Sequence, residues 1–319
     1  EDGIRDAQES RGLGDVYKRQ RITNKHNLPQ TLVNLAKSRD YSRGKSDRSI
    51  TQLIDSPQVS VLRMANENNI SEDVVDTFWA NLGSAIHHIT EKGADDDHLV
   101  EERLFTEVGN WTISGAIDIQ KLESDGSISV LDYKFTSVWS VKNPKLDWER
   151  QLNCYAFLVA KEKKKKIKDL KIVTFLRDWN RNNAKRDFKY PQQQILVVPI
   201  KLWSFKEQEK YMEDRVRLHQ ETVYGFISNK SMSECTDEER WQREDKYAVR
   251  KESNVRALRV FDNKKEAEKF LKESKTTKDS KEYVIDERKG EPIRCTGNYC
   301  KVNEWCNQYQ EWSKTNHVE

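Results

Sequence analysis

Two acidic side chains and a lysine stand on neighbouring predicted strands, where together they could bind a divalent metal ion. The first strand is predicted over 111–119 and contains Asp118; the second is predicted over 127–135 and contains Asp132 and Lys134. Both segments are rich in β-branched and aromatic residues, and the Ser-Asp-Gly sequence between them predicts a β-hairpin. Because side chains alternate along a strand, Asp132 and Lys134 must share one face.

This combination of side chains suits hydrolysis of a phosphodiester. Carboxylate oxygens are the ligands that hard cations such as Mg²⁺ and Mn²⁺ prefer. A lysine beside them can orient or deprotonate an attacking water, or neutralise charge on the phosphoryl group. The same Asp-x-Lys pattern also fits a solvated sheet face with an ion pair. The flanking segments therefore decide between the two interpretations.

Two predicted helices flank the strand pair. Residues 71–92 have apolar side chains at helical spacing, with Ser71 as the expected start, and His87 projects from this segment. A neutral imidazole is a common metal ligand, although a lone histidine is more often a surface residue. Residues 147–160 form the second predicted helix. The acidic pair Glu101-Glu102 lies between the first helix and the strands.

The order of these residues resembles the PD-(D/E)XK nuclease superfamily. The resemblance is closest to its RecB-type branch, which includes the CRISPR-adaptation exonucleases and phage-encoded relatives. The residues that carry it are Gly83-x-x-x-His87, Glu102, Gly115-x-x-Asp118, Asp132-x-Lys134 and Gln151-x-x-x-Tyr155. One position departs from the pattern, because many relatives have a glutamate where this chain has Asp132.

The resemblance implies a role for each matching residue. His87, Asp118 and Asp132 would bind Mg²⁺ or Mn²⁺, with the backbone carbonyl of Tyr133 as a further ligand. Lys134 would be the catalytic lysine. The remaining pair, Gln151 and Tyr155, would position the DNA or the active-site lysine.

A second candidate site consists of cysteines. Cys154 lies among apolar residues of the 147–160 helix and is expected in the core, whereas Cys235, Cys295, Cys300 and Cys306 form a possible set of four ligands. No signal peptide is visible, and clustered cysteines in a reducing compartment favour a metal over disulfides. The spacing is looser than that of a zinc ribbon. Relatives in the RecB-type branch often carry a [4Fe–4S] cluster, which favours that cluster over zinc; free thiols are the third alternative.

The predicted elements give a fold class and a domain plan. Helices and strands alternate as in an α/β (α+β) protein, and the resemblance implies a restriction-endonuclease-like core with a central mixed sheet flanked by helices. The expected divisions are a non-native-looking head (residues 1–20), a loose lead-in (21–47) and the nuclease core (48–230). A small inserted αβ unit (231–294) and a C-terminal cysteine-rich staple (295–319) are expected to follow.

Composition narrows the function classes only a little. The net charge of +3 is too small to indicate nucleic-acid binding by itself, although residues 161–168 (KEKKKKIK) form a local basic cluster. No stretch approaches about 18 consecutive apolar residues, so no membrane-spanning segment is expected.

The resulting hypothesis is a metal-dependent DNA nuclease, with an exonuclease favoured over an endonuclease. By resemblance it would act in the cytoplasm of a prokaryotic host cell, in phage or prokaryotic DNA replication, recombination or repair. Its partners would be single- or double-stranded DNA and phage or host replication or recombination proteins. The alternative is a non-catalytic DNA-binding accessory module stapled by a metal or cluster.

Overall fold

The chain forms two compact units, Glu1–Met232 and Ser233–Glu319. The computed structural model describes residues 21–38, 44–143, 146–228, 231–274 and 283–316. The interpretation of residues 1–20 as a non-native-looking head lies outside the described residues. Among the described residues, none of the helices has the length and apolar composition that a membrane span requires.

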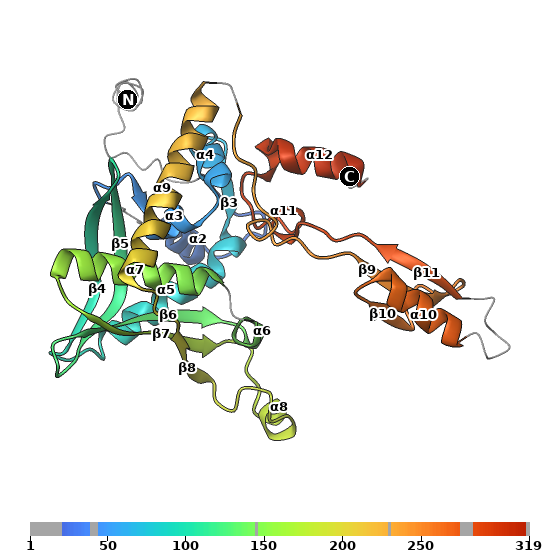
Figure 1. The fold of residues 1–319 in the computed structure, drawn as a ribbon, viewed down its shortest axis with the longest axis horizontal. Helices are drawn as coiled ribbons and strands as arrows, with labels where there is room; N and C mark the ends of the chain where they lie inside the picture. Colours follow the sequence, from blue (N-terminus) through green and yellow to red (C-terminus); the bar gives the residue numbers. More distant parts are fainter. Residues whose placement is uncertain (1–20, 39–43, 144–145, 229–230, 275–282, 317–319) are drawn as a thin grey trace. The chain divides into compact units, whose positions relative to one another are not determined.

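The first unit is built around a mixed sheet of six strands (Figure 1). The strand order is β2-β5-β6-β7-β8, and β4 pairs with β5 in addition. The elements of this unit are β1 (Arg21–Thr23), α2 (Gln30–Lys37), β2 (Arg48–Ser49), α3 (Ile50–Ile54), α4 (Pro57–Ala65), β3 (Ser71–Asp73), the 3₁₀-helix η1 (Val74–Thr77), α5 (Phe78–Glu91), β4 (His98–Val108), β5 (Trp111–Leu122), β6 (Ile128–Thr136), α6 (Val138–Lys142), α7 (Leu146–Lys163), β7 (Ile167–Leu176), α8 (Arg181–Arg186), β8 (Ile195–Ile200) and α9 (Phe205–Ile227).

The predicted hairpin is present. β5 pairs antiparallel with β6, and the turn between them is closed by a hydrogen bond from Gly126 N to Glu123 O. Gly126 has a φ of 78°, a left-handed conformation that glycine adopts without steric cost. Parallel pairings of β6 with β7 and of β2 with β5, and antiparallel pairings of β4 with β5 and of β7 with β8, complete the mixed sheet. The predicted fold class, a central mixed sheet flanked by helices, is confirmed.

Helix α7 is the central helix of the first unit. It is buried continuously from Leu152 to Val159, and it packs against β4, β6 and β7 as well as α3 and α9. Figure 1 shows α7 and α9 next to each other beside the strands. A helix that is apolar on all sides belongs in the interior of a domain. The core around it joins residues of α3, β4, β5, β6, β7 and α9, including Leu53, Val108, Ile113, Val130, Ile172 and Met212.

The helix predicted over 71–92 begins later than its apolar spacing suggested. Residues 71–73 are strand β3, which pairs parallel with β1, and η1 separates this strand from α5. The Asp73 carboxylate accepts hydrogen bonds from Thr23 Oγ1 at 2.8 Å and from Lys25 N at 2.9 Å. It also caps η1 at Val75 N. These contacts hold the segment extended, and they give residues 21–38 defined elements where the sequence predicted a loose lead-in.

The second unit consists of a small sheet, one covering helix and a C-terminal helical segment. Strands β9 (Lys246–Lys251), β10 (Arg259–Phe261) and β11 (Tyr283–Arg288) form an antiparallel sheet in the order β10-β9-β11. Helix α10 (Lys264–Ser274) packs on it through Ala267 and Phe270. The segment α11 (Ile293–Thr296), η3 (Asn303–Trp305) and α12 (Asn307–Thr315) follows. The segments 231–294 and 295–319, which the sequence separated, therefore lie in one compact unit whose boundary is close to residue 230.

Candidate active site

The backbone pairing between β5 and β6 stops where the predicted acidic residues begin. The paired residues run from Leu122 with Ile128 as far as Ile119 with Leu131, and the strands part beyond that point. There the Asp118 carboxylate replaces a backbone carbonyl as the hydrogen-bond partner, because its Oδ2 accepts a hydrogen bond of 2.8 Å from Tyr133 N. We call this place, defined by Asp118 and residues 132–134, the strand fork.

Asp118 sits at the strand fork in a strongly perturbed environment. Its side chain is almost fully buried. Burial, and secondly the nearby charge of Asp132, raise the pKa of Asp118 from 3.8 to about 7. A carboxyl group with a pKa raised this far is typical of a site that binds a cation.

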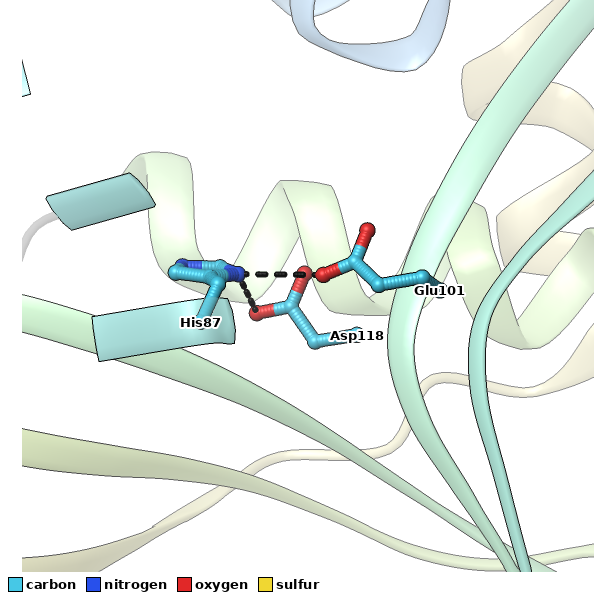
Figure 2. Close-up of side chains that lie close together, drawn as sticks. All are labelled: His87, Glu101 and Asp118. Atoms are coloured by element: carbon cyan, nitrogen blue, oxygen red, sulfur yellow. Dashed lines mark hydrogen bonds and ion pairs between the residues drawn. The ribbon is translucent and has the colours of Figure 1, made fainter. Parts of the chain in front are cut away.

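His87 and Glu101 complete a cluster around Asp118 (Figure 2). His87 Nδ1 lies 3.2 Å from Glu101 Oε1 and 3.5 Å from Asp118 Oδ2. The donor atoms of the three residues all lie within 4.8 Å of one another, and among the described residues this is the one such group of three. The hydrogen bond to Glu101 raises the pKa of His87, with the charges of Asp118 and Asp132 acting in the same direction. One imidazole and two carboxylates form a donor set suited to a divalent cation.

Glu101 reaches this cluster through an unusual backbone conformation. It lies between Val100 and Glu102, which pair with Ile119 and Ile117 of β5, and its φ is 49°. A left-handed conformation within a strand is uncommon for a residue with a side chain, and strained residues of this kind cluster at functional sites. The neighbouring Glu102, which the resemblance selected, instead accepts a hydrogen bond of 2.6 Å from Gln120 Nε2 and pairs with Lys163. The structure thus places Glu101 at the site, and simple alternation along β4 gave no means of choosing it.

Asp132 and Lys134 share one face of β6, as alternation predicted. Lys134 Nζ lies 2.6 Å from Asp132 Oδ2. Asp132 Oδ2 is buried, and Lys134 is the cation that offsets its charge, although the contact lacks hydrogen-bond geometry. The neighbouring carboxylates of Asp118 and Asp132, together with the imidazole of His87, fit a divalent metal ion.

Comparison with known proteins identifies the family. The sequence model of the PD-(D/E)XK nuclease superfamily matches residues 47–307. The chain belongs to this superfamily. Among solved structures, it is similar to one titled "Crystal structure of SSO0001", with 16% sequence identity, a TM-score of 0.43, and coverage of 65% of this chain and 97% of that one. A similarity of that size carries no argument about function. No curated protein sequence matches the chain.

The remaining predicted residues of the PD-(D/E)XK site lie on β6 and α7. The Tyr133 ring packs against His87 and Phe175, at centroid distances of 6.3 Å and 5.8 Å. On α7, Gln151 Nε2 donates a hydrogen bond of 2.9 Å to the Tyr155 hydroxyl. The roles of the Tyr133 carbonyl, Gln151 and Tyr155 in binding metal or DNA stay predictions.

Gly115 shows why a glycine is needed in this part of the superfamily motif. A Cβ atom at this position would lie 2.9 Å from two carbons of the Tyr155 ring and 3.1 Å from Leu158 Cδ2. These distances are shorter than ordinary packing contacts between carbon atoms. Glycine therefore lets α7 pack directly on β5, three residues before Asp118.

The four C-terminal cysteines all belong to the second unit. Gln308, two residues after Cys306, holds the backbone of Cys235 through a hydrogen bond from Cys235 N at 3.1 Å and another to Cys235 O at 2.9 Å. Burial, and then the proximity of Cys300 and Cys306, raise the pKa of Cys295 to about 11. All five cysteines of the chain are thiols rather than disulfides. Cys154 is buried in the core of the first unit, as expected.

Proposed function

We propose that this protein is a Mg²⁺- or Mn²⁺-dependent DNA nuclease that hydrolyses phosphodiester bonds. The observation that carries the proposal is the strand fork. There His87, Glu101 and Asp118 converge within 4.8 Å, beside the ion pair that the buried Asp132 makes with Lys134. A solvated sheet face with an incidental ion pair does not account for this arrangement, because Asp118 and Asp132 are both buried. Two buried carboxylates repel each other and cost stability unless a cation is bound beside them.

Each residue of the fork has a part in the reaction. His87, Glu101, Asp118 and Asp132 would hold the metal, which supplies a nucleophile at neutral pH and neutralises charge on the phosphoryl group. Asp132 fixes the position of Lys134 by the 2.6 Å ion pair, while the Lys134 side chain stays 26% exposed. Lys134 can therefore orient the attacking water or stabilise the negative charge that develops on the phosphoryl oxygens. Tyr133 N keeps the Asp118 carboxylate in a fixed orientation.

The finer placement within the superfamily remains a prediction. The RecB-type branch is favoured by the order of the motifs from Gly83 to Tyr155. Exonuclease activity, a role in phage or prokaryotic DNA replication, recombination or repair, and a place in the cytoplasm of the host cell are further predictions from that resemblance.

Cleavage of end-labelled DNA tests the proposed activity. Wild-type protein is incubated with single- and double-stranded DNA in Mg²⁺ or Mn²⁺, beside Lys134→Ala and Asp132→Ala. The matched control is Lys171→Ala, which removes another ion pair within the same sheet, with Asp169 Oδ2 at 2.8 Å. We expect metal-dependent products from wild type and Lys171→Ala, and none from the other two variants. Retained cleavage in both fork variants would contradict the proposal. Salt-sensitive DNA binding without any products would favour the non-catalytic accessory module.

We also propose a four-thiolate site at Cys235, Cys295, Cys300 and Cys306, with a [4Fe–4S] cluster favoured over zinc. The support is the resemblance to RecB-type relatives, which often carry such a cluster, and the placement of all four cysteines in the second unit. Iron and sulfide analysis of anaerobically purified protein tests this; zinc without iron would contradict it.

A further inference from the structure

Helix α5 carries a row of functional groups that extends beyond the metal site. Trp79, Gly83 and His87 are spaced four residues apart, so they lie along one face of the helix. The separation of eight positions between Trp79 and His87 corresponds to about 12 Å along the helix axis. The face that holds the predicted metal ligand His87 therefore leads directly to an aromatic side chain.

The middle of this row is open. A Cβ atom at Gly83 would have no heavy atom within 4 Å, apart from its chain neighbours and the backbone of its own helix turn. Glycine in a helix interior is unfavourable compared with alanine, and Gly83 has no packing contact that would require it. The helix backbone at Gly83 is therefore uncovered between the Trp79 and His87 rings, which allows another molecule to approach it closely.

Trp79 is both exposed and held in place. Its side chain is 52% exposed. The guanidinium carbon of Arg177 lies 4.5 Å from the centroid of its ring, and the rings of Phe78 and Phe135 lie at 5.0 Å and 6.2 Å. Phe135 follows the predicted catalytic Lys134 directly in β6. An exposed tryptophan oriented by neighbours and stacked with an arginine is a suitable surface for a nucleobase.

Helix α5 also leaves its apolar side chains uncovered. None of its residues is fully buried, and Phe78, Trp79 and Ile89 are exposed. Exposed aromatic side chains in contact with each other, as Phe78 and Trp79 are, suit a binding surface when a charged group lies beside them. Arg177 is exposed and supplies the positive charge that a phosphate backbone requires.

We propose that α5 binds an unpaired DNA strand, which crosses the helix at Gly83 and stacks a base on Trp79 and Arg177. The proposal rests on the nuclease function proposed above, and it adds the substrate class. A base within a duplex is stacked on both faces and cannot lie on a protein ring, whereas an unpaired base can. The strand fork would then receive the phosphodiester a short distance along the same strand.

Binding measured without cleavage tests this directly. The probe is a fluorescein-labelled oligothymidylate in EDTA, compared with a labelled hairpin duplex. We expect Trp79→Ala to weaken oligothymidylate binding about 5- to 100-fold, from the usual contribution of one stacked base. Trp79→Phe should retain most of the affinity, and duplex binding should be unchanged. The matched control is Trp139→Ala, since Trp139 is also exposed, at 64%. An equal loss on both probes, or no loss, would overturn the proposal.

A second pair of variants tests the open row independently. Gly83→Leu places a side chain in the row, whereas Ala85→Leu places the same side chain on the other side of α5, where Ala85 is exposed. We expect only Gly83→Leu to lose oligothymidylate binding, with thermal melts showing both variants folded. Equal binding by the two would overturn the proposal.

The two proposals fail in different ways. If Lys134→Ala loses cleavage while Trp79→Ala binds like wild type, α5 does not bind the strand and the nuclease function stands. If cleavage is never seen while binding depends on Trp79, the strand site stands and the nuclease function fails.

Discussion

Alanine in place of Gly115 should destabilise the first unit by overpacking the contact between β5 and α7. The added Cβ would lie 2.9 Å from Cδ1 and Cε1 of the Tyr155 ring and 3.1 Å from Leu158 Cδ2. Tyr155 and Leu158 are both buried in the core. The Tyr155 hydroxyl accepts a hydrogen bond from Gln151, so the ring cannot turn aside without breaking it. Relief therefore requires α7 to move away from β5.

The size of this effect follows from known costs of overpacking. Extra methyl groups in a closed core cost about 1–3 kcal/mol. Replacing glycine with alanine also restricts the unfolded chain, which offsets about 0.5–1 kcal/mol of that cost. We therefore expect a net loss of about 1–2 kcal/mol in the free energy of unfolding. For a unit of this size, such a loss lowers Tm by roughly 2–8 °C.

Gly83→Ala is the matched control, because it makes the same chemical change in open space. The added Cβ has no neighbour within 4 Å, and alanine is favoured over glycine in a helix by about 0.5–1 kcal/mol. Thermal and urea unfolding should therefore show opposite signs for the two variants. Tyr155→Leu removes the ring that Gly115→Ala meets, so the double variant should cost less than the two single changes added together. Stability equal to wild type in Gly115→Ala, or strict additivity in the double variant, would refute the close packing of Tyr155 on β5.

Two further predictions concern the acidic cluster. The raised pKa of Asp118, about 7 against an ordinary 3.8, means that the folded protein keeps a proton that the unfolded chain loses, so metal-free stability should fall as pH rises from about 4 to 7. The raised pKa of His87 acts with the same sign, since its contribution is complete below about 6.5 and is lost above. Calorimetry of the metal-free protein from pH 5 to 8 should show this fall in Tm, with a flatter profile in Asp118→Asn. Mn²⁺ should raise Tm more at pH 8 than at pH 5. A rise of the metal-free Tm with pH would contradict the assignment. Separately, Glu101→Gln should weaken Mn²⁺ binding about tenfold or more by titration calorimetry, whereas Glu102→Gln should not; the reverse order would show that Glu102 is the ligand.

Local signals in the sequence predicted the elements that local interactions determine. The break between α3 and α4 lies at a proline, a residue that favours the first turn of a helix. Ser56 accepts a hydrogen bond from Val59 N, and Pro57 occupies the first turn of α4. The β5–β6 hairpin follows from its turn and from the alternation of its side chains. In these cases the residues that specify the element lie within it.

Interactions between distant residues account for what the sequence did not predict. The sequence predicted a helix where β3 forms. The strand that holds β3 extended, β1, lies about fifty residues earlier, so the local pattern did not reveal the pairing. Glu101 was missed because its left-handed backbone conformation depends on the surrounding sheet, and an acidic pair alone does not show which member turns inward. The need for Gly115 likewise appears only when Tyr155 of α7 is seen above it.

The strand fork explains how two carboxylates can be brought together in the interior at a tolerable cost. Continued pairing of β5 and β6 would have satisfied Tyr133 N with a backbone carbonyl and left Asp118 with no partner there. Because the strands separate after Ile119, the Asp118 carboxylate fills that place, and Lys134 balances the charge of Asp132. The remaining cost stays visible in the raised pKa of Asp118. A cation bound at the fork would remove this penalty, so the burial that weakens the metal-free fold also favours binding of the metal.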